Sequence, residues 1–122
     1  MAQGSTSQHP SLSLDTVFEL LANRRRRFAL YSLLDSSEDP IEFETLIEDV
    51  ATLEAAVLRQ PLTRELYQDI AADLYRWHLP VLSDVGIVDC DPRHELIRCL
   101  DHPLLAQWAA RVRQDELGQQ ED

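Results

Sequence analysis

The stretch that decides the fold runs from Tyr67 to Val88 and reads YQDIAADLYRWHLPVLSDVGIV. Apolar residues recur in it at helical spacing as far as Leu82. The helical pattern stops at residues 84–86, where the chain reaches Gly86, and Ile87 and Val88 then begin a strand. The stretch therefore predicts one long helix that leads directly into a strand.

Thr63 is the predicted N-cap of this long helix. Apolar residues nearly surround the helix axis, so we expect the helix to be buried on most sides. These residues are Leu66, Ile70, Ala71, Leu74, Tyr75, Trp77, Leu79, Val81 and Leu82. The remaining polar stripe consists of Asp69, Asp73, Arg76, Ser83 and Asp84. Pro80 removes the hydrogen bond to the carbonyl of Arg76, which predicts a kink or a restart of the helix.

A β-hairpin is predicted after the long helix, with strands at residues 87–91 and 96–100. Pairing Asp89 with Arg98 places opposite charges across the solvent face of the hairpin. The same register turns the other face, with both cysteines, toward the core. That face consists of Val88, Cys90, Ile97 and Cys99. The two cysteines are then diagonal, and we interpret them as small buried hydrophobic residues.

One more amphipathic helix is predicted at residues 103–116, with residues 117–122 frayed. Its apolar stripe has two alternative uses, because it packs either on its own domain or against a second copy across a two-fold axis. The candidate packing or dimer residues are Leu104, Leu105, Trp108 and Val112, with Ala109 on the same stripe. We expect a homodimer.

Three shorter helices are predicted before the long one, at residues 13–23, 24–34 and 44–56. Residues 1–12 are small and polar and predict a disordered tail, so the domain covers residues 13–116. Asp15 or Thr16 is the expected first N-cap, and Asn23 caps the second helix. Leu14, Val17, Phe18 and Leu21 are expected to face the core. The expected outward face of the third helix carries Glu42, Glu44, Glu48, Asp49 and Glu54.

The basic cluster of the chain consists of Arg24, Arg25, Arg26 and Arg27. One interpretation is a contact with phosphate or with an acidic partner. However, four consecutive helical residues sweep about 300° around the axis and cannot share one face. The alternative is therefore that some of these side chains pack over the core and pair with carboxylates inside the domain.

The charge of the chain is unusual for one small domain of 122 residues. It has 22 acidic and 11 basic residues, a net charge of -11, and all basic residues are arginine. Such a charge repels phosphate and destabilises the compact state in dilute buffer. A basic partner would explain it, but we favour adaptation to molar salt, where the Debye length falls to about 3 Å. The acids are scattered, whereas an interaction tail would be a block of like charge.

Several functional classes lack their sequence signatures here. No apolar stretch reaches the ~20 residues of a membrane span, and residues 1–10 do not resemble a secretion signal. With two cysteines, the expectation is a cytoplasmic protein with reduced thiols. His9, His78, His94 and His102 show no metal-ligand spacing, and no glycine-rich phosphate loop exists. We therefore expect no enzyme, metal or cofactor, and interpret His78 as a core-edge residue bonded to the backbone.

The order of helices, hairpin and final helix resembles the winged-helix class, close to ArsR-type regulators. Residues 14–27, together with the motifs at residues 78–82 and 86–88, are similar to a haloarchaeal winged-helix domain family of unknown function. The resemblance covers residues 13–100. Members of that family are described as transcriptional regulators, so it implies a mainly α winged helix-turn-helix that binds double-stranded DNA. The candidate DNA contacts are Arg24, Arg25, Arg26, Arg27, Arg76 and Arg93.

Two features favour an alternative, namely a protein-interaction or dimerisation module that keeps this scaffold without reading DNA. About twenty residues, 52–71, separate the third helix from the recognition positions of the long helix, where ArsR-like domains have a short turn. In addition, a DNA reader presents Ser, Thr, Gln, Asn or Arg to base edges. The matching positions here are Asp69, Asp73 and Arg76.

Overall fold

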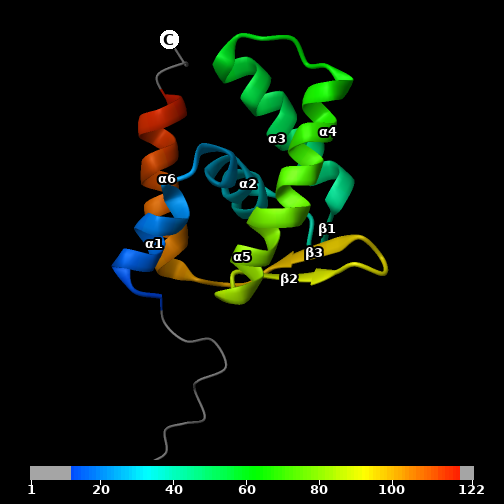
Figure 1. The fold of residues 1–122 in the computed structure, drawn as a ribbon. Coiled ribbons are helices and arrows are strands. Elements are labelled where there is room, and N and C mark those ends of the chain that lie inside the picture. The colour runs from blue at the N-terminus through cyan, green and yellow to red at the C-terminus, as the bar shows by residue number, and fades with distance from the viewer. Residues whose placement is uncertain (1–11, 119–122) are drawn as a thin grey trace, which may run out of the picture.

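The computed structural model describes residues 12–118, which form a mainly helical domain with one small antiparallel sheet (Figure 1). The elements are α1 (Leu14–Leu21), α2 (Arg24–Asp35), β1 (Ile41–Glu42), α3 (Phe43–Leu58), α4 (Arg64–Asp73), the π-helical turn η2 (Leu74–His78), α5 (Leu79–Asp84), β2 (Val88–Asp91), β3 (Leu96–Cys99) and α6 (Pro103–Leu117). The predictions of a tail at residues 1–11 and of fraying at 119–122 lie outside the described residues. Leu12, which we had assigned to the tail, packs against the core.

Short polar side chains cap three of the helices. Asn23 Oδ1 accepts the N–H of Arg26 at 2.9 Å, and Thr63 Oγ1 accepts that of Leu66 at 3.0 Å, which confirms both predicted caps. The prediction for α1 was wrong, because the cap is Ser13, whose Oγ accepts the N–H of Thr16 at 3.1 Å. Ser13 keeps an extended backbone, whereas Asp15 and Thr16 already lie inside the helix.

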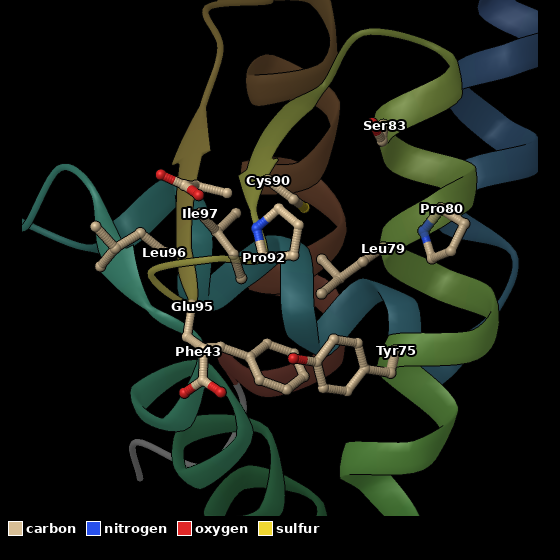
Figure 2. A pocket seen from close by; sticks show the side chains of 11 residues that line it. Phe43, Tyr75, Leu79, Pro80, Ser83, Cys90, Pro92, Glu95, Leu96 and Ile97 are labelled. Carbon is tan, nitrogen blue, oxygen red and sulfur yellow. The ribbon is translucent and has the colours of Figure 1, made fainter.

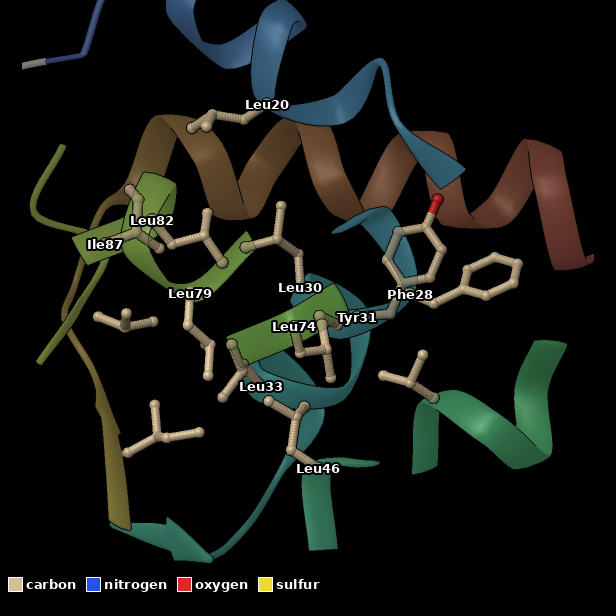
Figure 3. Close-up of a cluster of buried hydrophobic side chains, with 14 of the residues drawn as sticks. Leu20, Phe28, Leu30, Tyr31, Leu33, Leu46, Leu74, Leu79, Leu82 and Ile87 are labelled. Atoms are coloured by element: carbon tan, nitrogen blue, oxygen red, sulfur yellow. The ribbon is translucent and has the colours of Figure 1, made fainter. Parts of the chain in front are cut away.

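The hydrophobic core lies between α2, α3, the long helix and the sheet (Figure 3). Its fully buried side chains include Leu30 of α2, Leu46 of α3, Leu74 of η2 and Leu82 of α5. These residues come from segments far apart in the chain. The periodic apolar residues of each helix thus meet in one continuous core, as expected for a domain of this size.

The long helix is continuous from α4 through η2 to α5, but its middle turn is π-helical. The backbone N–H of Leu79 donates to the carbonyl of Leu74, five residues back, rather than to the residue four back. Pro80, which follows directly, has no N–H to give to Arg76. The widened turn therefore lies where the proline was predicted to disturb the helix.

The prediction that the long helix is buried on most sides was wrong. Trp77 is 64% exposed, Tyr75 is 50% exposed, and Val81 is also exposed. The helix buries one side, with Ile70, Leu74, His78, Leu79 and Leu82. The physical reason is that α3 packs beside α4 and the strand β2 packs beside α5, so the outer side of the long helix stays open (Figure 1).

The sheet has three antiparallel strands in the order β1-β3-β2. Asp89 pairs with Arg98 as predicted, and the two cysteines are diagonal because Cys90 pairs with Ile97. The short strand β1 adds a third strand, in which Ile41 also pairs with Ile97. The order of α2, β1, α3, the long helix and the hairpin β2–β3 is compatible with a winged-helix arrangement. We call β2–β3 and its turn the wing.

The additional helix α6 packs on its own domain, against α2 and α1. It buries Leu105 and Ala109 completely, and it extends one residue past the predicted end. Phe18 of α1, predicted to face the core, is 47% exposed and instead meets Trp108 edge-on, with ring centroids 5.2 Å apart. Leu14 is exposed as well, because α1 has only eight residues and only its inner side is covered.

Candidate interaction surface on the long helix and the wing

Arg25 of the basic cluster is bound inside the domain. Its Nε and Nη2 donate to the two carboxylate oxygens of Glu54, at 2.9 and 2.6 Å, and its Nη1 reaches Asp73 at 3.2 Å and Asp69 at 3.4 Å. The hydrogen bonds with Glu54, despite partial burial, raise the pKa of Arg25. Glu54 was predicted to face outward and is 3% exposed, because the guanidinium satisfies its carboxylate from α2.

Arg26 and Arg27 are also held by internal acceptors. Arg26 donates to the carbonyls of Leu20 and Glu19 at the end of α1, both at 2.8 Å, and burial lowers its pKa. Arg27 donates through Nε and Nη2 to the carboxylate of Glu116 on α6, at 2.9 and 2.8 Å. Three arginines of the cluster thus tie helices together, and the exposed one is Arg24.

Arg76 and Arg93 are placed differently from the cluster. Arg76 is exposed on η2, and Arg93 is exposed in the turn of the wing. Across residues 12–118, neither guanidinium forms a hydrogen bond or ion pair. The six arginines proposed as DNA contacts therefore fall into two groups. Arg25, Arg26 and Arg27 bind inside the domain, whereas Arg24, Arg76 and Arg93 point to solvent.

Apolar side chains flank Arg76 on the open side of the long helix. Tyr75 and Trp77 are its immediate neighbours, and Val81 is exposed one turn beyond Trp77. The sequence contains a signal for this exposure. Residues two apart in a helix point about 200° from each other, so a helix that buries one side cannot bury both Tyr75 and Trp77.

An apolar pocket of about 200 Å³ lies between the long helix and the wing (Figure 2). Its base is the ring pair of Phe43 and Tyr75, with centroids 4.1 Å apart. Its other walls come from α5 and from both strands of the wing, and are Leu79, Pro80, Ser83, Cys90, Pro92, Leu96 and Ile97. Asp91 and Glu95 bring carboxylates to its edge. We call this pocket, with exposed Arg76, Trp77 and Val81, the helix–wing face.

The wing turn is held by one side-chain contact and one backbone hydrogen bond. The imidazole Nδ1 of His94 lies 2.9 Å from Oδ2 of Asp91, and this hydrogen bond lowers the pKa of Asp91. Glu95 has a left-handed backbone with φ 58°, and its carbonyl accepts the N–H of Phe43 at 2.9 Å. The start of α3 is thus tied to the turn, beside the two carboxylates at the edge of the pocket.

His78 is a buried residue of η2 that contacts a carboxylate, so the prediction of a backbone hydrogen bond was wrong. Its Nε2 lies 3.2 Å from Oδ2 of Asp73, and its Nδ1 is buried without a hydrogen-bond partner. Burial lowers the pKa of His78, although Asp73 opposes this effect. The physical reason for this difference is that the π-helical turn directs the imidazole ring of His78 back toward Asp73.

Two classes of site are missing from the part of the chain that the structure describes. Within residues 12–118, no group of three or more His, Cys, Asp or Glu side chains is placed to hold a metal ion. The same residues contain no helix of the length and apolarity that crossing a membrane requires.

A family model matches more than half of the chain. The family model described as Domain of unknown function (DUF7344) matches residues 18–98, which extend from α1 to β3 and include the helix–wing face. The helix α6 lies beyond the matched residues. No curated protein and no solved structure matches the chain.

Proposed function

We propose that this chain, which belongs to the family described as Domain of unknown function (DUF7344), is a protein-interaction module on a winged-helix scaffold. Its docking surface is the helix–wing face. The module has a regulatory role in this proposal and associates through the surface that winged-helix proteins use to read DNA. We further propose that its acidic, lysine-free composition is an adaptation to a cytoplasm with molar salt.

The observation that carries this proposal is the exposure of Trp77, beside exposed Tyr75 and Arg76 on the open side of the long helix. An exposed tryptophan forgoes the largest hydrophobic stabilisation that a side chain offers. Tryptophan, tyrosine and arginine are also the residues that dominate the energetics of protein–protein interfaces. A face that combines them with an apolar pocket fits a protein better than a phosphate backbone.

Electrostatics favours the same conclusion. The long helix and the wing, which carry Arg76 and Arg93, also carry exposed carboxylates, which are Asp84 on α5 and Asp89, Asp91 and Glu95 on the wing. Nucleic-acid binding domains present a basic patch and commonly a pI above about 9, whereas this chain has a sequence pI of about 4.6. Apolar contacts also keep their strength in molar salt, where phosphate contacts lose theirs.

Site-specific photocrosslinking in the native host tests the proposal. A photoreactive phenylalanine analogue replaces Trp77 in one variant and Gln107, exposed on α6, in the control. We expect a light-dependent protein adduct at position 77 that is missing at position 107. If position 77 yields adducts that contain DNA only, or no adduct, the proposal is wrong.

A second candidate function is that of a DNA-binding transcriptional regulator of winged-helix type. It is favoured by Arg76 and Arg93, which lie on the long helix and the wing tip without ion pairs among residues 12–118. These are the elements with which winged helices contact DNA. In this function the chain binds double-stranded DNA, and the two guanidiniums supply the contacts.

Fluorescence anisotropy with duplex DNA across a salt series distinguishes this second candidate. Arg76→Ala and Arg93→Ala should each weaken binding and lower the slope of log affinity against log salt by about 0.9. Arg111→Ala is the matched control, because Arg111 lies on α6 beside the ring of Trp108. Affinity that is equal in all four proteins would contradict DNA contact through the long helix and wing.

A further inference from the structure

We infer that the partner of the helix–wing face is a second copy of this chain, and that Trp77 of each copy occupies the pocket of the other. The inference rests on the proposed function and names its partner. Among residues 12–118 of the single chain, no side chain fills the pocket, and Trp77 is 64% exposed.

The size of the pocket restricts its occupant. Its volume of about 200 Å³ is below the roughly 300–1,000 Å³ of pockets that enclose whole small molecules. It suits one large side chain that a partner protein inserts. The walls suit an aromatic ring, since Phe43 and Tyr75 offer ring faces and edges while Pro80, Pro92 and Leu79 close the sides (Figure 2).

The chain's own Trp77 cannot fill the pocket. Tyr75 points from the long helix toward Phe43 and lines the pocket (Figure 2). Trp77 follows two residues later, so its side chain leaves another side of the helix, and it is not among the lining residues. The tryptophan and the pocket therefore lie on opposite flanks of one helix, and only another molecule can bring an indole to the pocket.

The charges on the two flanks are complementary. Arg76 precedes Trp77 directly and has no ion pair within residues 12–118. The pocket edge carries the carboxylates of Asp91 and Glu95, and the imidazole Nδ1 of His94 lies 2.9 Å from Oδ2 of Asp91. When Trp77 is inserted, the guanidinium of Arg76 comes close to the carboxylates at the pocket edge. This attraction favours docking of the side of the helix that carries Arg76 over the acidic rest of the surface.

Two copies are enough to pair each Trp77 with a pocket, so the assembly is a closed dimer. A two-fold axis parallel to the long helix places the Trp77 flank of each copy next to the pocket flank of the other. Two identical insertions then form at once, and neither copy is left with an unfilled helix–wing pocket that could extend the assembly. This dimer uses the long helix and the wing, whereas the apolar stripe of α6 covers its own domain.

Sedimentation equilibrium of the full chain in molar potassium chloride tests the inference through complementary variants. Trp77→Ala removes the insertion and leaves the pocket intact. Ser83→Met leaves Trp77 intact and fills the pocket, because a flexible thioether adapts to irregular gaps. We expect wild type to be dimeric, each variant alone to be monomeric, and an equimolar mixture to recover heterodimers with one intact contact. Trp108→Phe, on α6, is the matched control and should remain dimeric.

Other outcomes separate this inference from the proposed function. A monomeric wild type at all concentrations, a dimeric Trp77→Ala variant, or a mixture that stays monomeric would each overturn the second-copy partner. If position 77 then still crosslinks to a different protein, the helix–wing face remains a docking surface for that protein. If position 77 crosslinks to no protein, both the partner and the proposed function are wrong.

Discussion

Arg25 and Glu54 form a two-point ion pair that joins α2 to α3, with nitrogen–oxygen distances of 2.9 and 2.6 Å. Asp69 and Asp73 of α4 also form ion pairs with the guanidinium of Arg25. One guanidinium thus joins three helices, and its charge is neutralised within the domain.

Glu54→Gln should destabilise the protein by about 2 kcal/mol, because a buried ionic hydrogen bond is lost while Asp69 and Asp73 still hold the guanidinium. Urea unfolding measures the change. Glu48→Gln, exposed on the same helix, is the control and should change the free energy of unfolding by less than about 0.5 kcal/mol. Equal unfolding midpoints for the two variants would contradict the structural role of the pair.

Glu116 should make the docking of α6 sensitive to acid. Burial raises its pKa, but hydrogen bonds from Arg27 and from the hydroxyl of Tyr31, at 2.7 Å, outweigh burial and leave the pKa lowered. A lowered carboxylate pKa contributes stability that is present above the ordinary value of 4.5 and is lost as the pH falls toward the folded value. The protection factors of the α6 amides, which correct for the intrinsic pH dependence of exchange, should therefore fall below pH 4.5, and Glu116→Gln should show the lower protection already at neutral pH.

His78 should be neutral in the folded protein at pH values where a free imidazole is already charged. Its pKa is lowered from 6.5 by burial, against the opposing effect of Asp73 and with the help of Arg26 and Arg25. The neutral form contributes stability above pH 6.5, and this stability is lost as the pH falls toward the folded pKa. An NMR titration of the imidazole measures the pKa. Titration at or above 6.5 would show that the ring is not desolvated as described.

The two sides of the long helix should respond differently to truncation. Leu74→Ala removes a fully buried side chain and should cost about 2–5 kcal/mol. Trp77→Ala, three residues later, should change the free energy of unfolding by less than about 0.5 kcal/mol at concentrations where the protein is monomeric. Urea unfolding measures both. A large loss for Trp77→Ala in the monomer would mean that its indole is buried.

Salt should stabilise the folded chain. With a net charge of -11, self-repulsion opposes the compact state, and molar salt reduces the screening length to about 3 Å. The thermal midpoint should therefore rise from low salt to molar potassium chloride. A midpoint that falls over this range would contradict the proposed adaptation to salt.

Local features of the fold were predictable from the residues near them. Asn23 and Thr63 cap their helices because each side chain bonds an N–H three residues later. The Asp89–Arg98 register follows from the alternation of apolar and polar residues in the wing. Pro80 predicted where the long helix is disturbed, because proline lacks a backbone N–H whatever its surroundings. The choice of Ser13 over Asp15 as a cap was missed, since several adjacent residues have capping side chains.

The contents of the candidate site depended on tertiary contacts. Spacing alone left open whether Arg25 meets phosphate or a carboxylate, because Glu54 lies 29 residues away and is brought close only by the packing of α2 on α3. In addition, the apolar character of a residue does not by itself determine whether its side chain is buried. Trp77 and Phe18 are both exposed.

Helical and strand periodicity, caps and the proline disturbance are set by bonds within a few residues, and the sequence by itself determined them. Which side of the long helix is covered, and which charges are neutralised, is decided where distant segments meet. Burial and pairing are properties of two surfaces at once, so only the tertiary structure could place Trp77 in solvent and Glu54 in the interior.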